Sequence, residues 1–423
     1  MITVWKWNLL WEEIEMTIKV SVIVLAALGS LYAIFLNVVR RRSANNPTPE
    51  SVSDVYDAET YARWKSYNAE HCKLELIFAI LTGVVSLAML FTNVYAAFAS
   101  LFPTGIYEQL LAVVILEFSV GFVLEIPRTY IATMVIEQKY GFNRSTMKTF
   151  IADRIRSAIF GALFSFLLAY LMAKTHAWVG DYLMLLFAGM MFLIMLLVTF
   201  LYPVFSRIGN KFVPLEEGEL KDRLMALLTK HGYRVKAIEV MDASRRTTKL
   251  NAYFTGFGKM KTIVLYDNLL NAMTPDEICA VFAHELGHGL HKDVLKQQTL
   301  NIVQFLLIGA LVWLVVRDPV WCEAFGFTGV NYGFAYVLVG VGLGVLQPLI
   351  ALLSNAVSRR AEYRADRQAV KEGYGEAMIT AFKKLARDNF AHLAPSPINV
   401  VLEYSHPPLH LRVQEVEKAM KEE

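Results

Sequence analysis

The chain has 423 residues, 55% of them hydrophobic, and its mean hydropathy is +0.40. This composition is too apolar for an ordinary soluble protein of this length, so it predicts several membrane-spanning segments. A net charge of +3 gives no indication of nucleic-acid binding, and three widely spaced cysteines (Cys72, Cys279 and Cys322) exclude a disulfide framework, so we expect three buried thiols.

Seven stretches are long and apolar enough to span a membrane, which takes about 20 residues. They are residues 20–39, 76–98, 106–126, 157–173, 182–205, 300–316 and 333–353. A charged loop is expected at 128–156. The chain then divides into four parts: five membrane helices with their loops (1–205), a polar domain (206–298), two membrane helices (299–353), and a charged helical segment (354–423) that completes the polar domain.

The basic residues predict the orientation of the chain. Arg40 to Arg42, the loop at 128–156, the polar domain and the C-terminal segment all fall on one side, and the other side has little more than Lys174 and Arg317. By the positive-inside rule the basic side is cytoplasmic and the N-terminus is outside. Two crossings separate the polar domain from the C-terminal segment, so side chains from both can meet on the cytoplasmic side.

The polar domain contains the sequence His284-Glu285-Leu286-Gly287-His288. Two histidines four residues apart on a helix place both imidazoles on one face, close enough to hold one zinc ion. Glu285 follows the first ligand and can take a proton from metal-bound water, the pKa of which zinc lowers. The alternative is a pair of ordinary histidines on the surface of a polar helix.

The residues around this motif favour the metal site. A predicted strand at 261–266 is followed by a short connection and then by Thr274-Pro275-Asp276-Glu277, a capping box with proline at the first helical position. The helix should therefore run over residues 275–292. A strand followed by a firmly capped helix is the usual setting of this zinc motif.

A third metal ligand is expected after the last membrane span. Glu362 and Asp366 lie four apart on a predicted helix, so Glu362 can complete a His2Glu zinc site and Asp366 can accept a hydrogen bond from a ligand imidazole. An amphipathic surface helix in which Glu362 pairs with an arginine is the alternative. His291 is a rival ligand, but three histidines within two helical turns make an awkward geometry.

Three further sets of residues are candidates for a functional role. His406, followed by two prolines, can donate a hydrogen bond to the oxyanion that forms on an attacked carbonyl, and Arg412 can orient a carboxylate. Residues 251–265, with Gly256 and Gly258 between two predicted strands, suggest a β-hairpin, and its edge can pair with an extended substrate through Asn251, Ala252 and Tyr253. A surface turn and a purely structural hairpin are the respective alternatives.

Glu117 falls in the middle of the third membrane stretch. A carboxylate at this depth faces either a protein partner or a water-filled cavity. The sequence alone leaves these two interpretations open.

Taken together, these motifs resemble the CAAX prenyl protease 1 family of integral-membrane zinc metallopeptidases. The resemblance covers most of the chain. It rests on Val-Ile-Glu-Gln-Lys-Tyr-Gly-Phe-Asn at 135–143, Asn-Ala-Tyr-Phe at 251–254, the histidine motif at 284–288, and the segments 362–366 and 405–412. Several separated motifs in one order are more specific than the histidine motif alone.

The resemblance implies one zinc ion held by His284, His288 and Glu362, with Glu285 as general base and acid and His406 and Arg412 completing the site. It implies that Asn251 to Tyr253 lie on a substrate-pairing strand. It also implies a mainly α-helical fold of seven membrane helices around a chamber, capped by a zincin-like metallopeptidase domain with a small sheet. Such a chamber would give Glu117 access to water.

The activity implied is hydrolysis of the peptide bond after a prenylated cysteine, which releases the last three residues of a CAAX sequence. The partners are then a prenylated or hydrophobic peptide and the lipid bilayer, with no nucleic acid. The chain is short for the family and has no dilysine retrieval tail, which favours a bacterial inner membrane over the endoplasmic reticulum of a eukaryote.

Two other functions remain open at this point. One is a quality-control metalloprotease, which degrades faulty membrane proteins and needs no prenyl group. The seven spans and His406 argue against the fold of such a protease. The other is a transporter or channel with a structural metal, which Glu285 disfavours because a structural site needs no general base.

Overall fold

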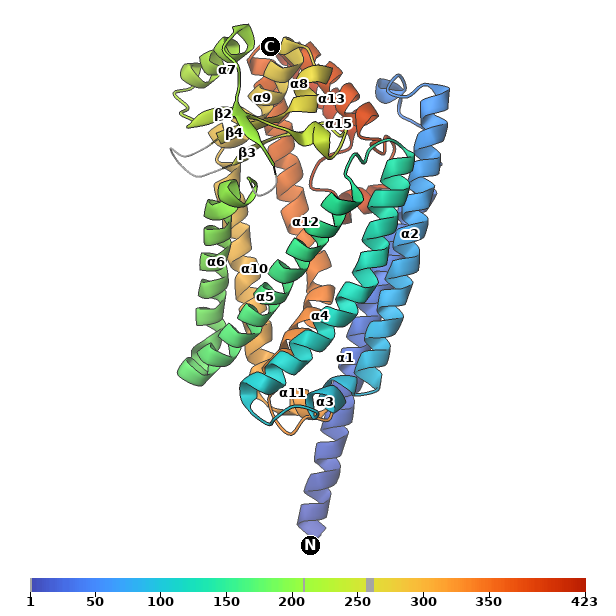
Figure 1. The fold of residues 1–423 in the computed structure, drawn as a ribbon, viewed down its shortest axis with the longest axis vertical. Coiled ribbons are helices and arrows are strands. Elements are labelled where there is room, and N and C mark those ends of the chain that lie inside the picture. The colour runs from blue at the N-terminus through green and yellow to red at the C-terminus, as the bar shows by residue number, and fades with distance from the viewer. Residues whose placement is uncertain (1, 208–209, 256–261) are drawn as a thin grey trace.

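The structure, a computed structural model, describes residues 2–207, 210–255 and 262–423. Figure 1 shows a bundle of long helices below a smaller domain of short helices and strands, with the two chain termini at opposite ends of the molecule. Within the described residues, seven helices are long and apolar enough to cross a membrane: Leu10–Ser43, Ala58–Phe91, Ile106–Glu137, Met147–Val179, Leu183–Leu201, Asp293–Arg317 and Tyr332–Lys371. The prediction of seven spans is confirmed.

The membrane bundle is built from helices that are longer than the predicted spans. They are α1 (Ile2–Ser43), α2 (Ala58–Phe91), α4 (Ile106–Tyr130), α5 (Met147–Val179), α6 (Leu183–Phe205), α10 (Asp293–Arg317) and α12 (Tyr332–Lys371), with short α3 (Val94–Ala99) and α11 (Val320–Glu323) at the end away from the small domain. The extra length carries several helices past the apolar stretch, so α12 reaches from the bundle into the small domain.

Two predictions about these helices were wrong. The second span does not reach residue 98, because α2 ends at Phe91 and Asn93 adopts a left-handed conformation (φ 55°) that turns the chain into α3. The predicted loop at 128–156 is mostly helical, since α4 continues through a π-helical segment, Ile131–Glu137. Several of the charges that suggested a loop are paired on helix surfaces; Arg128, for example, contacts Glu75 at 2.7 Å.

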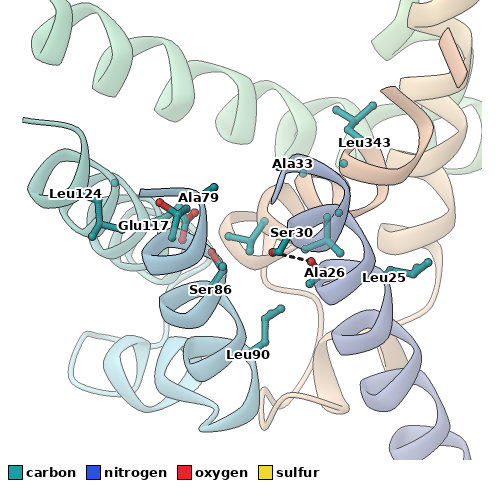
Figure 2. A pocket seen from close by; sticks show the side chains of 18 of the residues that line it. Leu25, Ala26, Ser30, Ala33, Ala79, Ser86, Leu90, Glu117, Leu124 and Leu343 are labelled. Atoms are coloured by element: carbon teal, nitrogen blue, oxygen red, sulfur yellow. Dashed lines mark hydrogen bonds between the residues drawn. The ribbon is translucent and has the colours of Figure 1, made fainter. Parts of the chain in front are cut away.

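A cavity of about 740 Å³ lies inside the bundle, bordered by α1, α2, α4 and α12 (Figure 2). Aliphatic side chains and glycines make up more than half of its lining, and Glu117 is one of its four charged residues, with Glu75, Glu125 and Arg128. The Tyr95 hydroxyl donates to the Glu117 carboxylate at 2.5 Å. Glu117 therefore both binds a protein partner and faces a cavity, so each of the two interpretations left open by the sequence describes part of its surroundings.

The small domain contains a four-stranded sheet within the described residues, in the order β1-β2-β4-β3. The strands are β1 (Phe212–Pro214), β2 (Ala237–Met241), β3 (Ala252–Thr255) and β4 (Thr262–Tyr266). β3 pairs with β4 antiparallel, with Ala252 opposite Leu265, which confirms the predicted hairpin and makes β3 an edge strand. Its turn, with Gly256 and Gly258, lies outside the described residues. β1 and β2 were not predicted.

Six helices complete the small domain. They are α7 (Glu219–Lys230), α8 (Asp267–Ala272), α9 (Pro275–Leu290), α13 (Gly375–Asp388), α14 (Pro397–Glu403) and α15 (Leu409–Glu422). The predicted capping box at the start of α9 is confirmed, because the Thr274 hydroxyl accepts from the Glu277 N–H and the Glu277 carboxylate accepts from the Thr274 N–H.

Helix α9 is buried on two opposite faces. Ile278, Phe282 and Leu286 pack on the sheet in one apolar cluster, whereas Ala280 and Ala283 pack against α12, α13 and α15 in another. A helix that is apolar on more than one face belongs in the centre of its domain. The small domain is therefore assembled around α9.

Helices α9 and α12 approach each other closely at Gly287. A Cβ atom at this position would lie 3.0 Å from the Ala365 Cα and 3.0 Å from the Gln368 Cβ. Only glycine on one helix and a small residue on the other permit this distance. The crossing places Glu362, one helical turn before Ala365, beside the face of α9 that carries His284.

We expect Gly287→Val to lower the free energy of unfolding by about 1–3 kcal/mol, because the added methyl groups would force the two backbones apart. The measurement is a denaturant titration of the purified protein in detergent. Gly340→Val is the matched control, since a Cβ at Gly340 meets no atom within 4 Å. Equal stability of the two variants would show that the crossing tolerates a side chain.

Candidate active site

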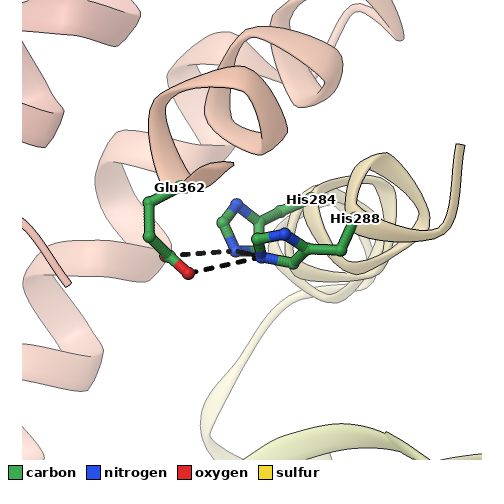
Figure 3. Close-up of side chains that lie close together, drawn as sticks. All are labelled: His284, His288 and Glu362. Atoms are coloured by element: carbon green, nitrogen blue, oxygen red, sulfur yellow. Dashed lines mark hydrogen bonds and ion pairs between the residues drawn. The ribbon is translucent and has the colours of Figure 1, made fainter. Parts of the chain in front are cut away.

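His284, His288 and Glu362 converge at the crossing of α9 and α12 (Figure 3). Within the described residues they form a group in which one ligand atom from each side chain lies within 4.8 Å of the others. The Nε2 atoms of the two histidines are 3.2 Å apart, and they lie 3.6 Å (His284) and 3.3 Å (His288) from the Glu362 carboxylate oxygens. His291, the C-cap residue of α9, is not part of this group.

These three side chains fit a metal ion. Ligand atoms bound tetrahedrally at about 2.1 Å from a zinc ion lie about 3.4 Å from one another, close to the separations seen here. The Glu362 Oε2 atom is buried and makes no hydrogen bond within the described residues; its ion pair is with the Arg412 guanidinium at 3.2 Å. Two ring nitrogens and a carboxylate form a donor set suited to a divalent transition metal.

Each histidine has a carboxylate at its other ring nitrogen. His284 Nδ1 lies 2.8 Å from Asp366, and His288 Nδ1 lies 3.3 Å from Asp293. A hydrogen bond at Nδ1 fixes the tautomer that leaves Nε2 free to accept a metal. Asp293 was not predicted. Its position, five residues after His288 and at the start of the next helix, could have indicated a carboxylate close to that imidazole.

Arg412, from α15, forms a two-pronged ion pair with Asp366. Its Nη2 and Nε atoms lie 2.6 and 2.9 Å from the two carboxylate oxygens of Asp366, and Nη2 lies 3.2 Å from Glu362. Both carboxylates are buried. The guanidinium therefore balances their charge and fixes their orientation, because a forked pair allows little rotation.

His406 reaches the same centre from the segment between α14 and α15. Its Nε2 atom lies 3.4 Å from Glu362, and its side chain is exposed to the cavity beside the metal ligands. Arg359 of α12 anchors this segment, since it donates to the carbonyl oxygens of Val400 at 2.9 Å and Tyr404 at 2.7 Å. This role of Arg359 was not predicted from the sequence.

Glu285 lines the same cavity, which has a volume of about 590 Å³. Burial raises the pKa of Glu285 above its ordinary value, and the positive charges nearby oppose that shift. A carboxyl group with a raised pKa holds a transferred proton more readily than an exposed one.

The predicted substrate strand borders this cavity only in part. Asn251 and Ala252 line it, whereas Tyr253 points to the opposite face of the sheet and packs near Met241 and Val264. This alternation is expected, because neighbouring side chains of a strand point to opposite faces. Any contact of Tyr253 with a substrate would therefore have to come from its backbone.

The three cysteines Cys72, Cys279 and Cys322 are buried and free, as predicted. None of them belongs to the metal-binding group found in the described part of the chain.

Comparison with known sequences gives two matches that cover most of the chain. Residues 214–420 match the description "Peptidase family M48", and residues 37–207 match "CAAX prenyl protease N-terminal, five membrane helices". The CAAX prenyl protease 1 of Saccharomyces cerevisiae is 30% identical over 401 residues, covering 86% of this chain and 87% of the yeast protein. The CAAX prenyl protease 1 homolog of Oryza sativa is 29% identical, covering 92% and 95%.

The fold has a counterpart among solved structures. The crystal structure of S. mikatae Ste24p superposes with a TM-score of 0.87 at 25% sequence identity, covering 95% of this chain and 99% of that chain. Agreement of sequence, fold and arrangement of motifs over nearly the whole length identifies the chain as a multi-pass membrane metalloendopeptidase that belongs to the CAAX prenyl protease 1 family.

Proposed function

We propose that this protein uses one zinc ion to hydrolyse a peptide bond near the C-terminus of prenylated CAAX peptides or other hydrophobic peptides. His284, His288 and Glu362 hold the ion. The observation that carries the proposal is their spacing, since the two Nε2 atoms are 3.2 Å apart and each lies within 3.6 Å of a Glu362 carboxylate oxygen, Oε2 for His284 and Oε1 for His288. Zinc in such a site supplies a Lewis acid and an activated water.

Glu285 takes a proton from the attacking water and returns it to the leaving amine. It lies on the same face of the cavity as the ligands, and its raised pKa suits both steps. His406 donates a hydrogen bond to the oxyanion, because its imidazole is exposed to the cavity and lies 3.4 Å from Glu362.

Asp366 and Arg412 position the ligands. Asp366 fixes the tautomer of His284, and Arg412 holds Asp366 and Glu362 in place through the contacts described above. Both act through other side chains, so their loss should affect metal affinity before it affects the chemical step.

The substrate adds a strand to β3. In the sheet order β1-β2-β4-β3 the free edge of β3 is open on the side of the cavity that Asn251 and Ala252 line. Backbone pairing with Ala252, whose backbone faces away from β4, would hold an extended peptide across the metal centre, and the Asn251 side chain would bind its backbone.

The cavity in the membrane bundle receives the isoprenoid or another apolar group. It has a volume of about 740 Å³, and aliphatic side chains such as Leu25, Leu90 and Leu124 line it. An apolar chain gains about 25 cal/mol for each Å² that it buries in such surroundings.

The basic side of the protein, which holds the metal centre, faces the cytoplasm. This orientation rests on the positive-inside rule and on the excess of basic residues described above. The proposal also keeps the four parts of the chain. Residues 1–205 and 299–353 form the membrane helices, and residues 206–298 and 354–423 form the two halves of the catalytic domain. A bacterial inner membrane remains a prediction from chain length, and the relatives named above are eukaryotic.

The central test compares a farnesylated CAAX peptide with its unprenylated twin. We expect the purified protein to cut the farnesylated peptide after the cysteine, a chelator to stop the reaction, and added zinc to restore it. Mass spectrometry of the products gives the site of cleavage. Equal rates for both peptides would contradict a prenyl requirement and favour the quality-control protease.

Glu285→Gln should lower kcat by about 10²- to 10⁴-fold, because the variant keeps the metal ligands and loses the proton acceptor. The measurement combines the cleavage assay with metal content by atomic emission, in which one zinc per chain is expected. Glu376→Gln is the control, since Glu376 is exposed on α13. Full activity of the Glu285 variant would show that Glu285 is not the proton acceptor, whereas absence of cleavage by the wild-type protein would favour the transporter alternative.

Asp366→Asn should weaken zinc binding by about 10- to 100-fold, because the amide cannot hold His284 as the charged carboxylate does. Titration with a competing chelator measures this affinity, and the thermal midpoint is followed in parallel. The control is Asp222→Asn, which changes an exposed residue of α7. An unchanged affinity would remove Asp366 from the site.

A further inference from the structure

A second cavity adjoins the candidate active site at the start of β3. It has a volume of about 490 Å³, and its lining includes Arg144, Thr248, Asn268 and Asn271. Leu250 lines both this cavity and the one that contains the metal ligands. The two cavities are therefore neighbours at Leu250, whose buried side chain borders each of them.

The direction of β3 indicates which part of a substrate would reach this second cavity. β3 runs from Ala252 to Thr255, and its other edge is occupied by β4. Antiparallel pairing is the more stable arrangement for an added strand. A peptide bound in this way runs opposite to β3, so its C-terminal residues pass the beginning of the strand and continue toward Leu250.

Pairing with the edge strand cannot continue past Asn251. The Leu250 N–H donates to the Asn389 side-chain oxygen at 3.0 Å, and the Asn389 amide donates to the Leu250 carbonyl at 3.2 Å. Both backbone groups of Leu250 are thus satisfied within the protein. A substrate that pairs with β3 must leave the strand here, beside the residue that borders both cavities.

Arg144 gives this cavity a cation that has no partner. Its backbone is fixed by a hydrogen bond to the Arg246 carbonyl at 3.0 Å, and its side chain is exposed. Within residues 2–207, 210–255 and 262–423 the Arg144 guanidinium makes no hydrogen bond or ion pair. Asp388, an acid that also lines the cavity, is paired with Arg387 at 2.9 Å.

Asn268 adds a second unused polar group. Its amide donates to the carbonyl oxygens of Lys249 at 2.7 Å and Thr247 at 3.3 Å, whereas its Oδ1 atom is buried without a hydrogen-bond partner in the described residues. An unpaired buried acceptor is the complement of a peptide N–H. An unpaired guanidinium is the complement of a carboxylate, which it binds through two parallel hydrogen bonds.

We propose that this cavity receives the end of the leaving segment and that Arg144 binds its free α-carboxylate. The inference rests on the proposed function, in which the last three residues of a CAAX sequence are released. Three extended residues span about 10 Å, which is enough to pass from the metal centre beyond Asn251. The protein would then recognise two parts of its substrate. The cavity in the bundle would bind the apolar group, and Arg144 would bind the terminal carboxylate.

The test uses the zinc-loaded Glu285→Gln variant, so that binding is measured without turnover. The probes are two fluorescent farnesylated peptides of the same sequence, one ending in a free carboxylate and one in a carboxamide. We expect the carboxylate peptide to bind about tenfold more tightly or better, as fits a charge-assisted hydrogen-bond pair.

Adding Arg144→Gln to this variant should bring the ratio of the two affinities close to one, and Arg144→Lys should restore part of it. The control is Arg245→Gln, which alters a nearby arginine that faces Asp242 and should keep the full ratio. A ratio near one before Arg144 is changed, or a ratio that survives Arg144→Gln, would overturn the inference.

The two proposals can fail separately. If the wild-type protein cuts both farnesylated peptides and no variant discriminates between them, the protease stands and the carboxylate site is wrong. If the peptides bind with the expected ratio but the wild-type protein cuts neither, the carboxylate site stands and the proposed reaction is wrong.

Discussion

The contact between α9 and α12 at Gly287 is the feature on which the metal centre depends. Two ligands come from α9 and the third from α12, and the distance between the two backbones sets the distance between the ligands. Gly287 and Ala365 are small enough to bring Glu362 to within 3.3 Å of His288. A bulkier pair would separate the helices by more than the short reach of metal–ligand bonds can bridge.

Charge balance is the second constraint on the site. Three carboxylates, those of Glu285, Glu362 and Asp366, lie near a single guanidinium, that of Arg412. Buried charges are stable only when they are paired, and this group carries an excess of two negative charges when all its carboxylates are ionised. A divalent cation removes that excess. A bound divalent cation would therefore balance the charge of the site as well as supply its chemistry.

The amino-acid sequence was sufficient for the features that depend on local pattern. Spans such as 300–316, the capping box at Thr274 and the pair His284 and His288 follow from hydropathy or from helical spacing. Features that depend on tertiary contact were missed. The identities of Asn389 and Asp293 do not indicate which backbone group or imidazole each side chain will meet. Most of the segment 128–156 is helical, and some of its charges, such as Arg128, find partners on neighbouring helices.

Helix α12 links the metal to the lipid. It begins in the bundle at Tyr332 and supplies Glu362 some thirty residues later (40 residues in all), while α10 returns the chain from α9 to the far side of the membrane. A ligand that binds only the folded arrangement stabilises it, and the coupling is reciprocal. Bilayer thickness or detergent that shifts α12 along its axis should therefore change the metal affinity of the proposed site.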